Sequence, residues 1–269
     1  MTSVLELPAC VTVRAPAKVN LELFVGPARE DGYHALSTVY QAVGIHDDVT
    51  ATLADEWGCS VRGRDADRVP TDESNLALRA ARALADHTGG QEPVHLTIHK
   101  EIPVAGGMAG GSADAAAALV ACDALWGTDV PKDELEGIAA GIGSDVPFLL
   151  HGGTAVGSGR GEVVTAVLAK GRYHWVFVPS LASGLSTPRV YAAFDERTAG
   201  TTLEEPQPSA ALMSALRSGD ASALAPVLDN DLQADAIGLQ PAIARAVPHG
   251  LKKVAGRIGY LLVAAGMLG

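Results

Sequence analysis

A run of glycines meets a run of alanines in the segment PVAGGMAGGSADAAAAL, residues 103–119. The N-terminus of a helix leaves about four backbone N–H groups without partners and carries the positive end of the helix dipole. Glycines just before such a helix allow the backbone to come close to a phosphate group. The segment therefore predicts an anion-binding loop, to which the hydroxyl of Ser112 adds a further donor.

A purely structural explanation competes with phosphate binding at this segment. Glycines also serve tight strand-to-helix turns and close packing, and the pattern matches neither a Walker A loop nor a GxGxxG loop. Ser112 and Asp114 are expected in the first helical turn, where a structural loop would need no more than a cap. We favour the phosphate-binding interpretation, although the glycines by themselves leave both open.

Two charged residues are candidates for chemistry on a hydroxyl group. Lys18 alternates with apolar residues in VTVRAPAKVNLELFV, residues 11–25, so it shares one strand face with Asn20. Asp145, which stands just before a Val-Pro pair, could accept a proton while a lysine keeps its carboxylate ionised. The ordinary interpretations are a solvated strand residue for Lys18 and a helix cap for Asp145, and the residues alone leave both open.

Periodic patterns predict the elements that must position these residues. Predicted strands cover residues 11–25, 36–43, 48–53, 94–100 and 173–180. Predicted helices cover residues 74–87, the stretch from the glycine segment to Trp126, and residues 132–140, 188–197, 208–217 and 221–228. Ser74 is the expected N-cap of the helix at 74–87, and Gly89 is expected to end it. The pattern indicates a mixed α and β chain with a domain boundary near Gly157.

Composition and charge argue against several classes of protein. The chain has 20 Lys plus Arg against 31 Asp plus Glu, and the resulting net charge of −11 argues against a nucleic-acid binder. Its three cysteines have no CxxC spacing, so we expect neither disulfides nor a zinc site or other protein-held metal. The sequence shows no leader pattern and no apolar run of about 18 residues. We therefore expect a cytoplasmic protein without a membrane span.

Several stretches of the sequence resemble the GHMP kinases, the superfamily of galactose, homoserine, mevalonate and phosphomevalonate kinases. The glycine segment is similar to the second motif of that superfamily. APAKVNLELFV and REDGYHALSTVYQAV, residues 15–25 and 29–43, resemble the branch that acts on 4-diphosphocytidyl-2-C-methyl-D-erythritol. GSDVPFLLHGGTAVGSGRGE and STPRVYAAF, residues 143–162 and 186–194, continue the match in the expected order.

The resemblance implies a fold, a reaction and its cofactors. It implies an α+β fold with an ATP-binding domain over residues 1–157, a second domain over residues 158–269, and an active site in the cleft between them. It implies an enzyme that uses ATP and Mg²⁺ to phosphorylate the 2-hydroxyl of this cytidine diphosphate substrate, in the non-mevalonate route to isoprenoids. The alternatives are another small-molecule GHMP kinase and a nucleotide-binding relative without catalysis.

The resemblance also implies roles for single residues. Lys18 and Asp145 would be the catalytic pair, with Asn20 beside Lys18. The residues implied in nucleotide binding are Asn75, Pro103, Gly106, Gly107, Gly110, Gly111 and Ser112.

Aromatic residues would bind the cytidine part of the substrate. Tyr33 and Tyr191 would lie on the two faces of the cytosine ring, His34 would hydrogen-bond its edge, and Thr187 would also contact the substrate. Without the resemblance, Tyr33 would be interpreted as an aromatic residue covering a turn and Tyr191 as a core-facing helix residue.

A third glycine motif, which GHMP kinases usually carry near the C-terminus, is not found in the sequence. The last residues, LLVAAGMLG at 261–269, resemble the helix that precedes that motif. We therefore expect the second domain to be incomplete.

Overall fold

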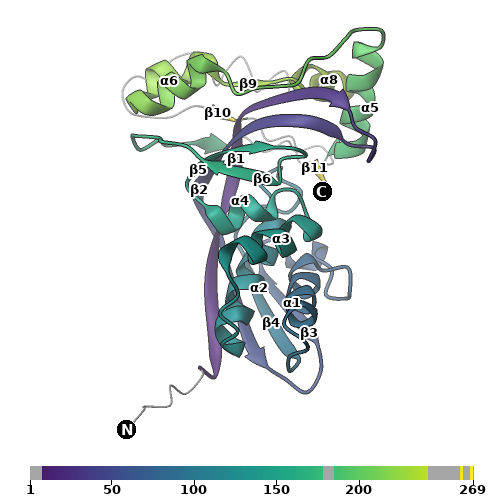
Figure 1. Cartoon of the computed structure of the whole chain (residues 1–269), viewed down its shortest axis with the longest axis vertical. Helices are drawn as coiled ribbons and strands as arrows, with labels where there is room; N and C mark the ends of the chain where they lie inside the picture. The colour runs from purple at the N-terminus through teal and green to yellow at the C-terminus, as the bar shows by residue number, and fades with distance from the viewer. Residues whose placement is uncertain (1–7, 178–184, 242–260, 263–266, 269) are drawn as a thin grey trace. The chain divides into compact units, whose positions relative to one another are not determined.

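The computed structural model describes residues 8–177, 185–241, 261–262 and 267–268 (Figure 1). Its strands are β1 Cys10–Ala28, β2 His34–Leu53, β3 Gly58–Gly63, β4 Val94–Lys100, β5 Thr154–Ser158, β6 Val163–Ala166, β7 Val176–Phe177, β8 Leu185–Ser186, β9 Asp229–Asn230, β10 Leu261–Leu262 and β11 Met267–Leu268. Its α-helices are α1 Leu76–His87, α2 Gly110–Trp126, α3 Lys132–Ile142, α4 Val146–His151, α5 Thr187–Thr198, α6 Ala210–Ser218, α7 Ala221–Leu224 and α8 Gln233–Leu239. Two 3₁₀ turns, η1 Ala66–Arg68 and η2 Ala225–Val227, complete the elements.

The chain forms two compact units, and each unit collects separate stretches of sequence. Unit 1 comprises Met1–Ala17, Gly44–Val104 and Ala109–Leu150. Unit 2 comprises Lys18–Val43, Ala105–Met108 and His151–Gly269. The long strands β1 and β2 therefore contribute residues to both units. The domain boundary near Gly157 stays a prediction.

Unit 1 packs two helices on a small sheet. Strand β4 pairs antiparallel with the second half of β2 and parallel with β3. Helices α1 and α2 pack against each other and against β4 (Figure 1). Their buried faces are rich in alanine, which lets two helices come close. The buried residues of the two helices include Ala77, Ala80, Ala81 and Leu84 of α1 and Ala113, Ala115, Ala117 and Ala118 of α2.

Unit 2 is built around the first half of β2 and the second half of β1. Strand β5 pairs antiparallel with β2 and with β6, and the short strand β9 pairs parallel with β1, with Glu22 opposite Asp229. An apolar cluster joins β1 to helix α5. Its buried members are Leu23, Val25, Leu185, Val190, Phe194 and Leu232.

Several predicted elements differ from the structure at their ends. The predicted strands at 36–43 and 48–53 are one continuous strand, β2, because successive partners, first β5 and then β4, hydrogen-bond along its length. The predicted strand at 173–180 is reduced to β7, Val176–Phe177, and residues 178–180 lie outside the described part. The helix predicted at 221–228 is an α-helix only over α7, Ala221–Leu224, and continues as the 3₁₀ turn η2, Ala225–Val227. The remaining predicted strands and helices are present within a few residues of their expected bounds.

The helix expected at 261–269 is a wrong prediction for the residues that are described there. Leu261–Leu262 pairs parallel with β7, and Met267–Leu268 pairs parallel with β8. Backbone hydrogen bonds to these strands replace the helical ones, and leucines tolerate either state. Residues 263–266 and 269, and the stretch 242–260, lie outside the described part of the chain.

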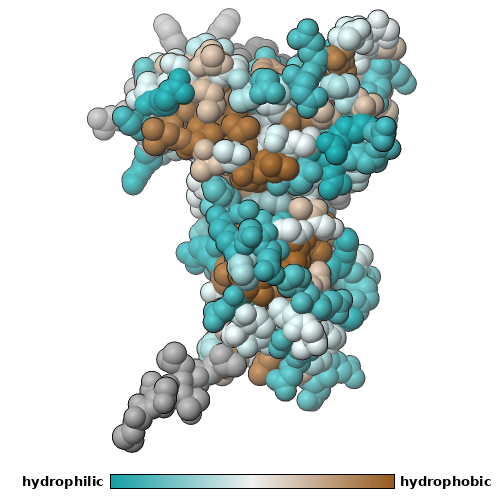
Figure 2. All heavy atoms as spheres, in the orientation of Figure 1, coloured by the Kyte–Doolittle hydropathy of each residue, from teal (hydrophilic) through white to brown (hydrophobic). Residues whose placement is uncertain are grey.

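The surface carries both hydrophilic and hydrophobic side chains. Figure 2 shows hydrophilic side chains over much of the visible face, with hydrophobic groups between them. Among the described residues, Tyr33 is a large side chain with 54% of its surface exposed. In that part of the chain no helix is long and apolar enough to cross a membrane.

Candidate functional site

In the glycine segment, alternate residues adopt the left-handed backbone conformation. Ala105, Gly107 and Ala109 have φ angles of 57°, 70° and 58°. Alanine in this left-handed region is strained, and such strain persists where the surrounding structure enforces it, often at ligand sites. Alternation of hand is typical of backbone nests that bind anions. Helix α2 begins directly afterwards at Gly110, and its N-cap Ala109 provides no side-chain cap.

Close packing explains one glycine of the segment but not all of them. A Cβ added to Gly110 would lie 3.1 Å from Lys100 Nζ and 3.2 Å from Ile102 Cγ2. A Cβ on Gly111 would meet Leu76 at an ordinary 3.4 Å. The structural interpretation therefore holds at Gly110, while the left-handed Gly107 and the uncapped helix start favour a bound anion.

Lys18 is a buried lysine held by a chain of hydrogen bonds. With 7% of its surface exposed, it does not match the solvated strand residue of the ordinary interpretation. Its Nζ donates to Asn20 Oδ1 at 2.7 Å, and Asn20 Nδ2 donates to Thr38 Oγ1 at 2.7 Å. Thr38 in turn donates to the carbonyl of Glu22 at 2.7 Å. The predicted pairing of Lys18 and Asn20 on one strand face is confirmed, and the chain of donors fixes the orientation of the Asn20 amide.

Two further contacts hold the same stretch of β1. The Lys18 ammonium lies 5.3 Å from the centre of the Tyr40 ring, a distance suited to a cation–π contact. The Lys18 backbone N–H donates to the carbonyl of Met108 at 3.2 Å, so the strand also holds the glycine segment.

Asp145 belongs to unit 1 and stands directly before α4. Val146 N–H donates to the carbonyl of Gly143 at 3.1 Å, and Leu149 N–H donates to the carbonyl of Asp145 at 3.3 Å. The residue is half-buried. Both roles weighed for its carboxylate, proton acceptor and helix cap, stay predictions.

Three of the predicted substrate residues lie in unit 2 on or near α5. The ring of His34 stacks on that of Tyr191, with centroids 5.5 Å apart and planes 20° from parallel. His34 Nε2 also lies 2.9 Å from Asp195 Oδ1. Thr187 is the first residue of α5, four positions before Tyr191. The structure therefore brings His34 and Tyr191 into contact at the start of α5.

Tyr33 has a partner that sequence reasoning missed. The guanidinium of Arg160 lies 4.9 Å from the centre of the Tyr33 ring. Arg160 follows Gly159, whose carbonyl accepts from Leu36 N–H at 2.8 Å, so the loop after β5 is tied to β2. The GSGRGE stretch could have indicated a loop, but not that its arginine lies over an aromatic ring.

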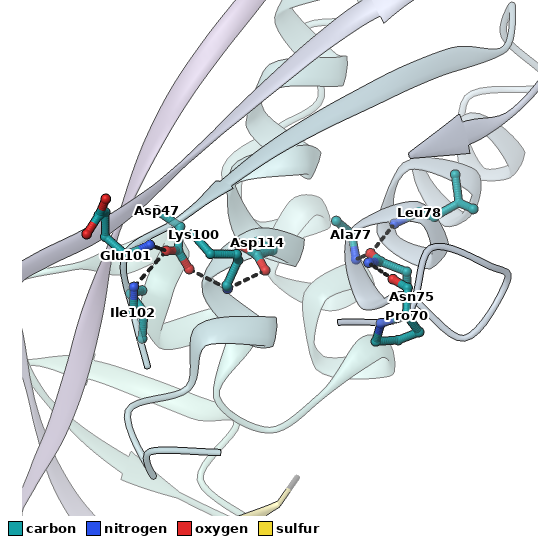
Figure 3. Close-up of polar contacts among 9 residues, drawn as sticks. All are labelled: Asp47, Pro70, Asn75, Ala77, Leu78, Lys100, Glu101, Ile102 and Asp114. Atoms are coloured by element: carbon teal, nitrogen blue, oxygen red, sulfur yellow. Dashed lines mark hydrogen bonds and ion pairs between the residues drawn. The ribbon is translucent and has the colours of Figure 1, made fainter. Parts of the chain in front are cut away.

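Asn75 has a clear structural task. It is buried, and its Oδ1 accepts from Ala77 N–H at 2.9 Å and from Leu78 N–H at 3.3 Å. Its Nδ2 donates to the backbone carbonyl of Pro70 at 2.7 Å (Figure 3). It is thus the N-cap of α1, and the prediction of Ser74 as the cap is wrong. The predicted place of Asn75 near the nucleotide stays a prediction.

Asp114 and its neighbours form a second cluster that the sequence did not indicate. Asp114 was expected in the first turn of the helix, but it is the fifth residue of α2, at the start of the second turn, and it is buried. It contacts Lys100, which also contacts Asp47 (Figure 3). These residues come from three separate elements, so their spacing in sequence carries no signal.

Comparison with known proteins gives consistent results. Residues 75–153 match the family described as GHMP kinases N terminal domain. Over 256 residues the chain is 52% identical to the 4-diphosphocytidyl-2-C-methyl-D-erythritol kinase of Salinispora arenicola (strain CNS-205), and the match covers 94% of this chain and 80% of that relative.

Two solved structures share the fold. The crystal structure of a 4-(cytidine 5'-diphospho)-2C-methyl-D-erythritol kinase is 30% identical, with a TM-score of 0.69 over 95% of this chain and 87% of that one. A homoserine kinase from Cytophaga hutchinsonii is 16% identical, with a TM-score of 0.66 over 99% of this chain and 85% of that one. The second likeness shows the α+β GHMP kinase fold alone. Since half of the residues are shared with a relative across almost the whole chain, the chain belongs to the 4-diphosphocytidyl-2-C-methyl-D-erythritol kinase family of the GHMP small-molecule kinases.

Proposed function

We propose that the protein transfers the γ-phosphoryl group of ATP to the 2-hydroxyl of 4-diphosphocytidyl-2-C-methyl-D-erythritol, a step of the non-mevalonate route to isoprenoids. The observation that carries the proposal is the 52% identity, over 94% of the chain, to a relative with that name. The buried Lys18 and the strained glycine segment support it, because phosphoryl transfer requires charge stabilisation and a phosphate cradle.

In this proposal the glycine segment holds the triphosphate. Gly106, Gly107, Gly110 and Gly111 let the backbone approach the phosphates, and Ser112 adds its hydroxyl. Pro103 begins the segment, and Asn75 would lie towards the adenine. Strained backbone and an uncapped helix start are ready before the ligand arrives, so little of the binding energy is spent on ordering the loop.

Lys18 and Asp145 are the proposed catalytic residues. Asp145 accepts the proton of the attacking hydroxyl, and Lys18 offsets the negative charge that develops during direct transfer. Asn20 holds the Lys18 ammonium at 2.7 Å. Because Thr38 fixes Asn20 from the other side, the lysine needs no reorganisation when the reaction begins.

Tyr33, His34, Thr187 and Tyr191 are the proposed contacts of the substrate's cytidine part. The exposed ring of Tyr33 offers a flat face for stacking, and His34, already placed by Tyr191 and Asp195, offers a ring nitrogen for a hydrogen bond.

ATP would bring Mg²⁺ with it. Within the described residues no group of three or more His, Cys, Asp or Glu side chains could hold a metal ion. Mg²⁺ is commonly held by substrate phosphates, waters and few protein ligands. When bound, the ion neutralises phosphate charge, and the residues of this chain hold and orient the groups that react.

ADP release in the steady state tests the proposal. Purified protein is assayed with MgATP and either the cytidine diphosphate substrate, homoserine or mevalonate. We expect turnover with the first acceptor only. Turnover with another acceptor would favour a different GHMP kinase, and ATP binding without turnover on any acceptor would favour a nucleotide-binding relative without catalysis.

A further inference from the structure

Lys100 is a fully buried lysine that the proposed reaction does not use. Only 2% of its surface is exposed. Its Nζ lies 2.5 Å from Asp47 Oδ2 and 2.6 Å from Asp114 Oδ2, so a single ammonium bridges two buried carboxylates (Figure 3). The three residues come from β4, β2 and α2, and all belong to unit 1. We call this group the Lys100 cluster.

One side of the Lys100 cluster holds the chain as it enters the glycine segment. Asp47 Oδ1 accepts from Glu101 N–H at 2.6 Å and from Ile102 N–H at 2.9 Å. These are the two residues between the end of β4 and Pro103. Since charge-assisted hydrogen bonds are strong, Asp47 fixes both the position and the direction of the backbone there.

The other side of the Lys100 cluster holds the start of helix α2. Asp114 lies in the second turn of that helix. A Cβ added to Gly110, the first residue of α2, would lie 3.1 Å from Lys100 Nζ. The ammonium therefore lies directly against the first turn of the helix and bonds to the second. Both ends of the glycine segment are thus linked to the Lys100 ammonium, the entry through the Asp47 carboxylate and the helix through the Asp114 carboxylate.

The charges of the Lys100 cluster are poorly suited to a purely stabilising role. Two carboxylates face one ammonium, and Asp114 Oδ1 is buried without a hydrogen-bond partner. Taking charges out of water is costly, and apolar residues of similar volume often serve stability better. Burial raises the pKa of Asp114 to about 7, although Lys100 opposes this shift and Asp47 adds to it. Such an arrangement is better explained by a need for one exact geometry.

We propose that the Lys100 cluster is a positioning device that sets the two ends of the glycine segment at the spacing required by nucleotide phosphates. The inference rests on the proposed function, because it takes the ligand of the segment to be a nucleotide. Lys100, Asp47 and Asp114 act through the backbone and are positioning residues. Loss of any of these side chains widens or loosens the loop. It therefore weakens ATP binding and leaves the binding of the cytidine substrate unchanged.

The variant Asp114→Ala removes the hydrogen bond between Lys100 and α2 and keeps the ion pair of Lys100 with Asp47. The matched variant Asp114→Asn keeps an oxygen acceptor for Lys100 at the same place. We expect Asp114→Ala to weaken ATP binding on the order of tenfold, because a hydrogen bond between charged groups that holds the start of α2 is lost. We expect Asp114→Asn to stay within about twofold, because its amide oxygen can still accept from Lys100. Isothermal titration calorimetry with MgATP measures both without requiring turnover.

A control separates positioning from general loss of stability. Leu125→Ala removes a buried side chain near the other end of α2 and should lower the melting temperature without changing ATP affinity. If Leu125→Ala weakens ATP binding as much as Asp114→Ala does, or if Asp114→Ala binds ATP like the wild type, the positioning role is wrong. If Asp114→Ala retains activity, its KM for ATP should be higher than that of the wild type, and its KM for the cytidine substrate should be unchanged.

Three further outcomes bear on the positioning role. If Asp114→Ala does not fold, the variant Asp114→Leu, which fills the volume and keeps the pair of Lys100 and Asp47, takes its place under the same expectations. If the wild type binds ATP but does not phosphorylate the cytidine substrate, the proposed function fails while the calorimetry still tests the positioning role. If the wild type does not bind ATP, both fail together.

Discussion

Lys18, the proposed partner of Asp145 in catalysis, is held in place before any ligand binds. It is buried, its ammonium is hydrogen-bonded to Asn20, and the Tyr40 ring lies 5.3 Å away. Ordering a lysine side chain costs up to about 2 kcal/mol of rotamer entropy. In this chain the Lys18 side chain is already ordered in the folded state. In the proposed reaction, this loss of entropy therefore does not reduce the rate of phosphoryl transfer.

Asp145 should be required for turnover but not for ATP binding. We expect Asp145→Asn to lower kcat by about 10²-fold or more, the range for loss of a general base, because an amide cannot accept the hydroxyl proton. The dissociation constant for ATP should stay within about twofold. Steady-state ADP release and calorimetry measure the two quantities, and near-normal turnover would remove Asp145 from the proposed role of base.

Tyr33 should determine the affinity for the cytidine substrate. Loss of a stacking partner costs about 1–3 kcal/mol per base, so Tyr33→Ala should raise the KM of that substrate by about tenfold or more while the KM of ATP changes little. Tyr33→Phe keeps the ring and serves as the control. A larger rise in the KM of ATP would place Tyr33 outside the cytidine site.

Asp114 should make the stability of the protein depend on pH. Its ordinary pKa is 3.8, and burial raises the pKa in the folded chain to about 7. Between these values the folded state holds a proton that the unfolded state has lost, so this group makes the folded state less stable as the pH rises through that window. Asp114→Asn removes the dependence. Its melting temperature relative to the wild type should therefore rise from pH 5 to pH 8, and an unchanged difference would contradict the shift.

At the scale of elements, the sequence predicted those whose signal is local. The alternation around Lys18 predicted β1. The junction of glycines and alanines predicted a helix that starts in the glycine segment, and its end was expected near Trp126, where α2 ends. The prediction of Ser74 as the N-cap of α1 was wrong because another residue, Asp72, binds Ser74. Asp72 Oδ1 accepts from both the N–H and the hydroxyl of Ser74, at 2.9 and 2.6 Å, which leaves Asn75 to cap α1.

The parts that could not be predicted depend on pairing between distant strands. The contact between Lys100 and Asp47 exists because β4 pairs with β2, with Asp48 opposite His99. The contact of Arg160 with Tyr33 depends on the pairing of β5 with β2. Neither register can be read from the spacing of these residues in the chain.

Helix α1 should lose stability when its observed cap is removed. Asn75→Ala leaves Ala77 and Leu78 N–H without their acceptor, and we expect a loss of about 1–2 kcal/mol in the free energy of unfolding. Ser74→Ala, at the position first expected to be the cap, should change it by less than about 0.5 kcal/mol. Urea unfolding compares the two variants. Equal losses would mean that Asn75 is not the main cap.

At the scale of the whole molecule, the compact units are interleaved along the chain. Both β1 and β2 begin in one unit and end in the other, because Lys18–Val43 belongs to unit 2 while the residues on either side belong to unit 1. A contiguous piece of sequence therefore carries parts of both units.

A fragment of residues 1–157 should fold only in part. It contains every stretch of unit 1 but lacks Val190 and Phe194, which pack with Leu23 and Val25 in the whole chain. Because these apolar side chains lose their cover, the fragment should bind a hydrophobic dye and self-associate, in contrast to the full chain. A monomeric fragment without dye binding would instead support a domain boundary near Gly157.

The pairing of β1 with β9 has a consequence for synthesis on the ribosome. Glu22 is made early, but its partner Asp229 follows about 200 residues later, which takes roughly 10–40 s at ~5–20 residues per second. During that time the edge of β1 at Glu22 and Leu23, the residues that pair with β9, has its backbone groups open to other chains. The nascent protein therefore exposes this edge until Asp229 has been translated, and chaperones that bind extended segments would act on β1 in that interval.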